Sequence, residues 1–371
     1  MESRSETRLS RVIILSHSSG TNALGRALSM ALTAREHFEV EVWAIDSGSL
    51  WVGASQFPFE VRVHATAIDV SRELRYRAVS ERLCVWIAKG MGSLSSIVRK
   101  IGSINNLILI ADFDDDDVGI ARSTTRKSTA HRLKLNPLHP DSPERILAAQ
   151  RRVWVTADAL TFSSPSLEAK YRERMPASST PSAVIPHTRT DQSEASCSPR
   201  PNGELRVGFL GTVVHYKGPE HLISLARSDR SVTVVTFEQR WQPPADLRDQ
   251  WHLLAPSTPL PKVYSDLDYL LVPSRKADDA TSHQLPAKMV DAAMSGVPVA
   301  ATPTAPIEDF FSGAFIPIDD WENPTRVLER IRSGDRIQLG LAIRQRYEQH
   351  LTPAATGTTL SELVFRTKGA R

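Results

Sequence analysis

The feature that most constrains this chain is a strand, helix, strand pattern that occurs twice. Val12–Leu15 is a continuous aliphatic run that ends at a small polar cluster, and apolar residues at helical spacing follow it. A second copy begins at Leu205–Leu210 and continues through a helix at Gly218–Arg227 to a strand at Ser231–Phe237. Continuous apolar runs are typical of parallel strands covered by helices on both faces. We therefore predict an α/β chain built on two parallel sheets.

The first helix is predicted to begin at Asn22, which can act as its N-cap, before a return to strand character at Phe38–Ile45. Helical spacing of Leu24, Leu28 and Leu32 supports that helix. The further predicted strands are Asn106–Phe113, Ala159–Ser163, Ala183–Pro186, Asp268–Val272 and Val297–Ala301.

The length of 371 residues suits about two domains, at roughly 100–200 residues each. Pro186–Gly203 is rich in Ser, Pro and Thr and has no apolar periodicity, which is typical of an interdomain linker. We predict an N-terminal Rossmann-like domain at 10–186, a linker at 187–203 and a second Rossmann-like domain at 204–345. Residues 346–371 are predicted to form a C-terminal helix that returns to the first domain.

Composition excludes several classes of protein. Lys and Arg number 45 against 42 Asp and Glu, a net charge of +3, which argues against a nucleic-acid partner. The two cysteines, Cys84 and Cys197, form neither a disulfide framework nor a zinc-ligand cluster. We predict no metal and no cofactor, and a reducing, cytoplasmic setting.

No apolar run approaches the roughly 20 residues that a membrane helix needs. Met1–Arg11 is polar and charged, so we predict no secretion signal. The loop 121–140 carries five basic residues, which leaves peripheral association with anionic lipid or an anionic acceptor open beside a plain solvated loop.

The segment Leu285–Thr302 predicts a loop, a helix, a tight turn and a strand, with Pro286 in the first helical turn and Gly296 at the helix end. Lys288 and Asp291 share one face near the start of this helix. A helix start and Lys288 suit a phosphate, and a carboxylate accepts hydrogen bonds from ribose hydroxyls. The alternative is that Lys288 and Asp291 only pair with each other on a solvated helix.

The segment Val207–Glu220 carries Gly208 and Gly211 at the end of a strand, followed by Lys217. Glycines permit a close approach of backbone to a ligand. Neither a P-loop nor a Gly-x-Gly-x-x-Gly dinucleotide fingerprint occurs here, which disfavours an ATPase or a dehydrogenase.

Together these segments resemble the sugar-nucleotide half of GT-B glycosyltransferases, in particular glycosyltransferase family 4. That family carries a Gly-rich strand end before Lys-Gly, and later Pro-x-Lys-x-x-Glu-x-x-x-x-Gly-x-Pro-Val. Weaker matches lie at Ala157–Leu167 and at Val184–His187, so the resemblance spans about 11–315. It implies two domains that face a central cleft.

The resemblance implies roles for particular residues. Lys217 would bind the donor diphosphate close to Gly211, and Asp291 would stand for the family's ribose-binding glutamate. His283 stands where many members have a second, sugar-binding glutamate, and Thr212 where they have Arg; both are retained as candidate site residues. Lys288, with Lys217 and His283, completes the predicted catalytic set.

The segment Ile110–Val118 places five Asp residues directly after an apolar strand. One interpretation is a divalent metal site of a phosphohydrolase. The preferred one, by resemblance, is an acceptor-side segment in which Asp112 and Asp114 contact sugar hydroxyls. The third is a solvated acidic loop without a role. By resemblance, the loop Ser16–Thr21, with Gly20, orients the transferred group through backbone N–H groups; the alternative is a plain turn between strand and helix.

The predicted activity is transfer of a sugar from a nucleoside-diphosphate sugar to an acceptor hydroxyl, with retention and without a metal. Lys217, Lys288 and the helix start would stabilise the charge on the departing diphosphate. Two alternatives remain open: a sugar-nucleotide epimerase on the same fold, and a catalytically silent protein that binds a nucleotide sugar. The acceptor, whether sugar, lipid-linked or a natural product, is not identified.

Overall fold

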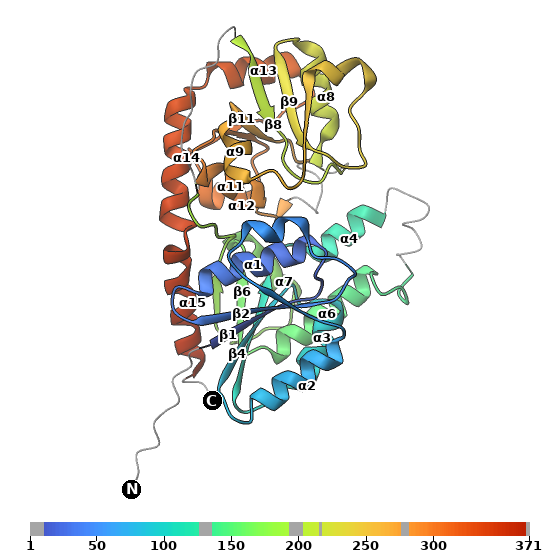
Figure 1. Ribbon diagram of the computed structural model, residues 1–371, viewed down its shortest axis with the longest axis vertical. Helices are drawn as coiled ribbons and strands as arrows, with labels where there is room; N and C mark the ends of the chain where they lie inside the picture. The colour runs from blue at the N-terminus through green and yellow to red at the C-terminus, as the bar shows by residue number, and fades with distance from the viewer. Residues whose placement is uncertain (1–10, 126–135, 193–202, 215–216, 276–281, 369–371) are drawn as a thin grey trace. The chain divides into compact units, whose positions relative to one another are not determined.

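A computed structural model describes residues 11–125, 136–192, 203–214, 217–275 and 282–368 (Figure 1). The chain divides into two compact units. Unit 1 comprises Met1–Thr188 and Pro353–Arg371, and unit 2 comprises Arg189–Thr352.

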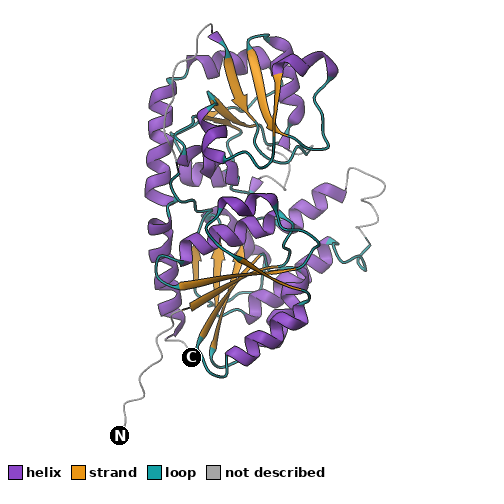
Figure 2. Ribbon diagram, in the orientation of Figure 1, coloured by secondary structure: helices purple, strands orange, loops and turns teal. Residues whose placement is uncertain are grey.

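Unit 1 is a parallel sheet with helices on both faces (Figures 1 and 2). Its strands are β1 (Arg11–Ser16), β2 (Glu39–Ile45), β3 (Val61–His64), β4 (Leu83–Ala88), β5 (Leu107–Phe113), β6 (Ala159–Phe162) and β7 (Ser182–Val184). Its helices are α1 (Asn22–Ala34), α2 (Ala67–Arg77), α3 (Gly92–Ile101), α4 (Asp117–Thr125), α6 (Pro143–Thr156), α7 (Pro165–Arg174) and α15 (Pro353–Lys368), with a 3-10 turn η1 (Val52–Gln56).

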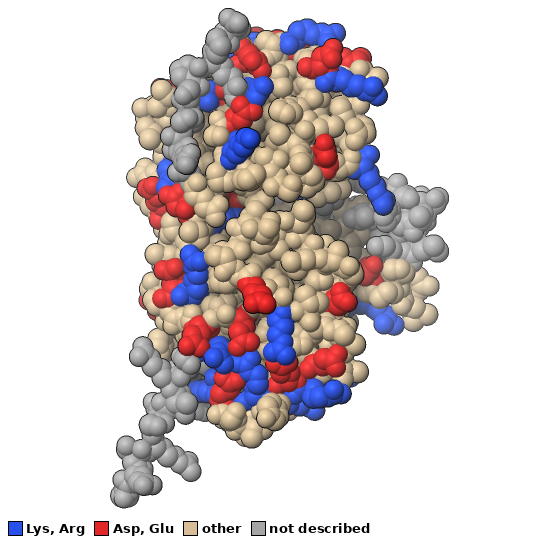
Figure 3. Space-filling view, in the orientation of Figure 1, with Lys and Arg blue, Asp and Glu red and all other residues tan. Residues whose placement is uncertain are grey.

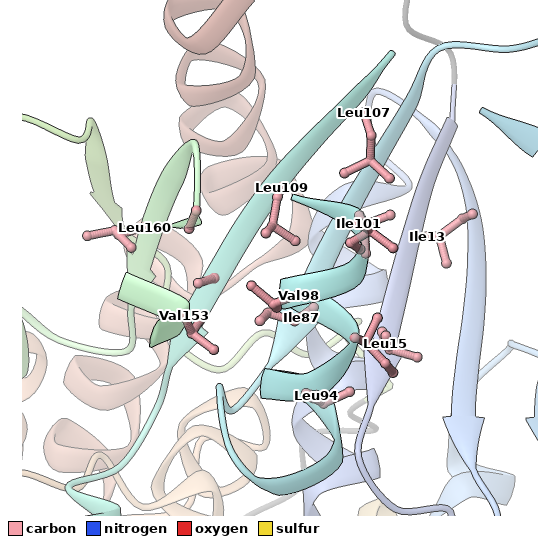
Figure 4. Close-up of a cluster of buried hydrophobic side chains, with 14 of the residues drawn as sticks. Ile13, Leu15, Ile87, Leu94, Val98, Ile101, Leu107, Leu109, Val153 and Leu160 are labelled. Atoms are coloured by element: carbon pink, nitrogen blue, oxygen red, sulfur yellow. The ribbon is translucent and has the colours of Figure 1, made fainter. Parts of the chain in front are cut away.

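The strand order in unit 1 is β3-β2-β1-β4-β5-β6-β7, and each described pair is parallel. Successive side chains of a strand point to opposite faces, so each central strand contributes to two cores. In β1, Ile13 and Leu15 join the core under α2, α3 and α6, whereas Val12 and Ile14 join the core under α1 and α15. Figure 4 shows the first of these cores. The strands therefore need apolar residues on both faces, which is why they read as continuous apolar runs.

Unit 2 repeats this plan with a second parallel sheet, in the order β10-β9-β8-β11-β12-β13. Its strands are β8 (Leu205–Gly208), β9 (Val232–Phe237), β10 (Trp251–Leu254), β11 (Tyr269–Val272), β12 (Val299–Ala301) and β13 (Ile316–Pro317). Its helices are α8 (Pro219–Ser228), α9 (Leu260–Ser265), α11 (Ala287–Met294), α12 (Ala305–Phe311), α13 (Pro324–Ser333) and α14 (Arg336–His350), with a 3-10 turn η5 (Ala245–Gln250).

The two faces of the unit 2 sheet also carry separate cores. The side chains of α9, α11, α12 and α14 cover one face, and those of α8, η5 and α13 cover the other. Met289 and Ala293 of α11 are completely buried against the first face. Packing of α11 on the sheet thus fixes where its first turn lies.

The predicted fold class, α/β with two parallel Rossmann-like sheets, is confirmed. The N-cap prediction was wrong by one residue, because Thr21 has the extended backbone of a cap and Asn22 is already helical. Pro286 is likewise the N-cap of α11 and not a residue of its first turn. Residues 346–352, predicted to leave with the last helix, belong to unit 2 because Tyr347 and Leu351 pack in its core.

Four strands were not predicted: β3, β4, β10 and β13. The edge strands β3 and β10 include polar residues, and β13 has only two residues. The run Leu83–Ala88 of β4 is fully buried and apolar, and a short run of that kind does not by itself distinguish a strand from a buried helix segment.

Charged side chains of both signs lie interspersed on the face shown in Figure 3. In unit 1, for example, Arg77 contacts Glu41 and Glu81 through side-chain ion pairs. Within the described part of the chain, none of the helices combines the length and apolar character required to cross a membrane.

Candidate functional site

The candidate site in unit 2 lies where the sheet meets the first turn of α11. The chain leaves β8 after Gly208 and continues through Phe209 to Gly211, and Lys217 precedes α8. The first turn of α11 is held in place by the buried Tyr264, whose hydroxyl donates to the carbonyl oxygen of Lys288 at 3.1 Å. The first N–H groups of a helix have no partner within the helix and point toward a ligand at its N-terminus.

Two lysines come together at this point. The Lys288 Nζ lies over the Phe209 ring, 4.0 Å from its centroid. Burial, with repulsion from Lys217, lowers the pKa of the Lys288 ammonium well below its ordinary value. Among the described residues, no carboxylate forms an ion pair with Lys288, so its charge is balanced by no acidic side chain there. Adjacent cations of this kind favour an anionic ligand, because an anion relieves their mutual repulsion.

Two glycines shape the backbone beside the lysines. Gly211 has a φ of +145°, and a Cβ at this position would meet no atom of the described residues within 4 Å, so the described part of the chain leaves space beside this backbone. Gly218 has a φ of +68°, and a Cβ would lie 2.2 Å from the carbonyl oxygen of Pro273. Gly218 is therefore required by both conformation and packing, and Gly211 leaves room for a ligand to approach the chain.

The Asp291 carboxylate is buried one turn after Lys288 and does not pair with it. Its Oδ1 accepts a hydrogen bond from the Arg189 Nε at 2.6 Å. Burial raises the pKa of Asp291, and the guanidinium of Arg189 opposes that rise. The alternative of a solvated Lys288–Asp291 pair is therefore wrong.

The remaining predicted residues of unit 2 lie around this point. Thr212 is exposed in the loop after Gly211, and His283 is partly buried just before Leu285 at the approach to α11. Arg275, in the loop after β11, pairs with Glu220 at the start of α8. Lys276 and His215 lie outside the described residues.

The structure places Asp112 inside the core of unit 1. It is completely buried, and its two oxygens accept hydrogen bonds from the Arg26 guanidinium at 2.9 and 2.7 Å. The Thr161 hydroxyl donates to Oδ1 at 2.8 Å. Both carboxylate oxygens are engaged in this buried pair, so Asp112 is not presented to an acceptor, contrary to its interpretation as a sugar contact.

Asp114 is also buried, and it shares one cation with its neighbours. The Lys89 Nζ lies 3.1 Å from Asp114 Oδ1 and 3.6 Å from Asp117 Oδ1, and it contacts Asp115 as well. Burial, then the charge of Asp115, raises the pKa of Asp114 to about 8. Burial also raises the pKa of Asp117, to about 6. The segment is thus neither solvated nor arranged as an open carboxylate cluster.

Among the described residues, no group of three His, Cys, Asp or Glu side chains is arranged to hold a metal ion. The ammonium group of Lys89 lies among these carboxylates, at the point where a bound metal ion would have to lie. The carboxylates therefore do not form the site that the phosphohydrolase interpretation requires.

The loop with Gly20 packs against a neighbouring loop of unit 1. The Gly20 N–H donates to the Ser47 Oγ at 2.8 Å, and a Cβ on Gly20 would lie 2.8 Å from that atom. Gly20 thus closes this serine-rich turn, and its N–H is already engaged. Arg122 of the basic loop lies in α4, whereas 126–135 lies outside the described residues.

Several residues that define these sites were not identified from the sequence. Arg189, Phe209, Lys89 and Arg26 come from four separate segments, and only the folded chain brings each to its partner. Phe209 could have been identified from the sequence, because it lies within the Gly-rich segment at the end of the strand. Arg26 could have been identified as well, since an arginine at a position otherwise buried on α1 requires an acidic partner.

No family model matches the sequence, and no curated protein matches it. Solved structures do match over nearly the whole chain. Sucrose-phosphate synthase from Thermosynechococcus elongatus has a TM-score of 0.69 at 14% identity, covering 98% of this chain and 100% of that one.

Two further structures were solved with nucleotides bound. Anabaena HepE in complex with UDP and glucose has a TM-score of 0.67 at 11% identity, covering 96% of this chain and 100% of that one. A Staphylococcus aureus TarM mutant in complex with fondaparinux, a GlcNAc-glycerol and UDP has a TM-score of 0.65 at 9% identity, covering 96% and 99%. The predicted resemblance to the GT-B glycosyltransferases is confirmed at the level of the fold. Membership of family 4 stays a prediction.

Proposed function

We propose that this chain transfers a glycosyl group from a nucleoside-diphosphate sugar to an acceptor hydroxyl, and that unit 2 binds the donor. The observation that carries the proposal is the pair of lysines, Lys217 and Lys288, at the first turn of α11. Lys288 has no carboxylate partner among the described residues, and the pKa of its ammonium is depressed. An anionic ligand at this turn restores its charge balance.

The diphosphate of the donor fits this chemistry. In glycosyl transfer, negative charge builds on the departing diphosphate while the sugar acquires oxocarbenium character. Lys288, Lys217 and the N–H groups at the start of α11 provide positive charge where that charge develops. Gly211 supports the assignment, because the described residues leave space for a ligand beside its backbone.

Asp291 is proposed to bind the ribose, and Thr212 and His283 to face the diphosphate and sugar. Asp291 lies one turn from Lys288 on α11. That separation suits the ribose hydroxyls of a nucleotide whose diphosphate lies at the helix start. HepE was solved with UDP and with UDP-glucose, so a uridine nucleotide is the first donor to test.

Retention of the anomeric configuration and independence of a metal belong to the same proposal. Positive side chains and a helix start provide the stabilisation of the leaving group that a metal provides in other enzymes. An assay in excess chelator and the anomeric form of the product test these two points. The loop Ser16–Thr21 of unit 1, which contains Gly20, remains proposed to orient the transferred group, through groups other than the Gly20 N–H that Ser47 already engages.

The decisive experiment is a thermal-shift screen of UDP, GDP and ADP and their hexose conjugates. A ligand at 100 times its Kd stabilises the folded state by about 2.7 kcal/mol. We expect one base to raise the melting temperature of the full chain, and Lys288→Met to abolish that rise. Lys262→Met, an exposed lysine of α9 in the same unit, is the matched control and should retain it. No shift with any diphosphate would refute the proposal.

A turnover assay then separates transfer from silent binding. The departures at Thr212 and His283 favour the silent alternative. Release of nucleoside diphosphate that depends on an added acceptor identifies a transferase. Tight binding without release identifies a protein that only binds the donor.

A further inference from the structure

Arg189 occupies a fixed position at the start of unit 2. It follows Thr188, the last residue of the first segment of unit 1. Its N–H donates to the carbonyl oxygen of Leu351 at 3.3 Å, and its own carbonyl oxygen accepts from the Tyr347 hydroxyl at 2.9 Å. Tyr347 is completely buried in the core on α14. The backbone of Arg189 is therefore anchored to the body of unit 2, so its side chain starts from a defined point.

From that point the side chain reaches α11. The Arg189 Nε donates to the Asp291 Oδ1 at 2.6 Å, and the two side chains are only 13% and 10% exposed. Among the described residues, the Asp291 carboxylate accepts no second hydrogen bond. The pair thus engages one carboxylate oxygen and leaves Oδ2 available to a ligand.

The buried Asp291 carboxyl needs a cation such as Arg189 beside it, because burial favours its protonated form. A buried carboxyl without a cation tends to be protonated, and a protonated carboxyl has lost part of its capacity to accept hydrogen bonds. Lys288 is the nearest cation along α11, but it lies over Phe209 and does not contact Asp291. Arg189 is therefore the cation that favours the ionised form of the Asp291 carboxyl, and its hydrogen bond orients that carboxyl.

We propose that Arg189 is a positioning residue that presents the ionised Asp291 carboxylate to the ribose hydroxyls of the nucleotide. The inference rests on the proposed function and extends it to a residue that contacts no substrate itself. The segment that follows Arg189 supports a fixed geometry, because Asp191 pairs with Arg344 of α14 at 3.1 Å. The segment that contains Arg189 is therefore bound to α14 at Arg189 itself, through Tyr347, and again at Asp191, through Arg344.

The test measures recognition of the ribose separately from binding of the diphosphate. Calorimetric titration of the full chain with a nucleoside diphosphate and with its 2′-deoxy analogue gives the preference for ribose; UDP and 2′-deoxy-UDP are used first, then the GDP and ADP pairs. We expect the wild-type chain to prefer the ribose form by about 10-fold, the size of a hydrogen bond to a charged group. Arg189→Gln should lose most of that preference at pH 7 while still binding the 2′-deoxy analogue.

Two further variants and a rise in pH keep the test informative. Arg189→Lys retains the charge and should retain part of the preference. In Arg189→Gln the preference should return as the pH rises, because the unpaired Asp291 carboxyl then ionises without its cation. Arg227→Gln, which removes an exposed guanidinium of the same unit, is the control and should behave as wild type.

The outcomes separate the inference from the function on which it rests. A wild-type chain that binds none of the diphosphates overturns the proposed function and the inference together. A wild-type preference that Arg189→Gln leaves intact overturns the inference alone. Loss of the preference in both the Gln and the Lys variants, with no recovery at higher pH, also overturns the inference. Arg189 would then act through its packing and not through the charge it provides to Asp291.

Discussion

Arg26 of α1 and Asp112 of β5 form a buried ion pair in which two guanidinium nitrogens meet the two carboxylate oxygens, at 2.9 and 2.7 Å. The same guanidinium donates to the carbonyl oxygen of Ile185, at 2.7 Å, just beyond β7. The pair therefore ties α1 to two strands of one sheet. Asp112, the first aspartate of a segment whose sequence suggests a ligand site, therefore stabilises the fold.

Asp112→Asn is expected to destabilise the fold strongly, because it leaves the Arg26 charge buried without compensation. Removing one partner of a buried pair costs about 3–5 kcal/mol. Urea unfolding of unit 1, followed by tryptophan fluorescence, measures the loss. Asp246→Asn in an exposed pair with Arg227 is the control and should change stability by less than about 1 kcal/mol. A stable Asp112→Asn variant with impaired acceptor binding would return Asp112 to the role predicted from sequence.

Asp114 is expected to make unit 1 less stable as the pH rises. The described cluster holds five aspartates, from Asp112 to Asp117 without Phe113, against four cations, Arg26, Lys89, Lys170 and Arg174. Burial, with the charge of Asp115, raises the pKa of Asp114 to about 8, so the folded state holds a proton that the unfolded state has released above about pH 4. Stability then falls between those two pH values by up to about 1.4 kcal/mol per pH unit.

Asp114→Asn removes that proton and should flatten the dependence of the melting temperature on pH between 6 and 8. Below about pH 4 the wild type and the variant should converge, because Asp114 is then protonated in both the folded and unfolded states. Asp246→Asn again provides the exposed control. An unchanged slope in Asp114→Asn would mean that another group of the cluster holds the proton, with Asp117 the next to be replaced.

The sequence predicts those features of the structure that are set by residues adjacent in the chain, and it does not predict contacts between distant residues. The start of α11 at Ala287, the turn at Gly296 and the glycine-containing end of β8 at Gly208 are each set by a few adjacent residues, and each was predicted close to its place. Asp112 and Asp114 were interpreted as sugar contacts, with a metal site or a solvated loop as alternatives, but the structure buries both aspartates against cations. Lys89 and Arg26 lie far from these aspartates in sequence, and nothing local indicates that they reach them.

Diphosphate binding is expected to depend on the charge state of Lys288. Burial and the charge of Lys217 lower the pKa of its ammonium, so the folded protein loses this cation at a lower pH than an exposed lysine would. Binding should therefore weaken as the pH rises through the depressed pKa. Lys217→Ala removes the repulsion and should move that decline to higher pH, while lowering affinity at neutral pH. Calorimetric titration with UDP from pH 6 to 10 measures both effects; a Lys217→Ala profile that declines at the wild-type pH would contradict the coupling.

Gly218→Ala is expected to disturb both stability and ligand binding, and a second glycine of unit 2 separates the two causes of the disturbance. Gly218 and Gly313 have similar φ values, +68° and +75°, but only at Gly218 would a Cβ meet backbone, at 2.2 Å from Pro273. Gly313→Ala should therefore cost about 1–2 kcal/mol from conformation alone. Gly218→Ala adds the steric conflict and should lower the free energy of unfolding further. Because Lys217 is the preceding residue, Gly218→Ala should also weaken the binding of UDP.

Thermal melting with and without UDP compares the two variants. Equal losses of stability would show that the loop before α8 yields to a Cβ, and unchanged binding in Gly218→Ala would show that Lys217 does not depend on this turn for its position.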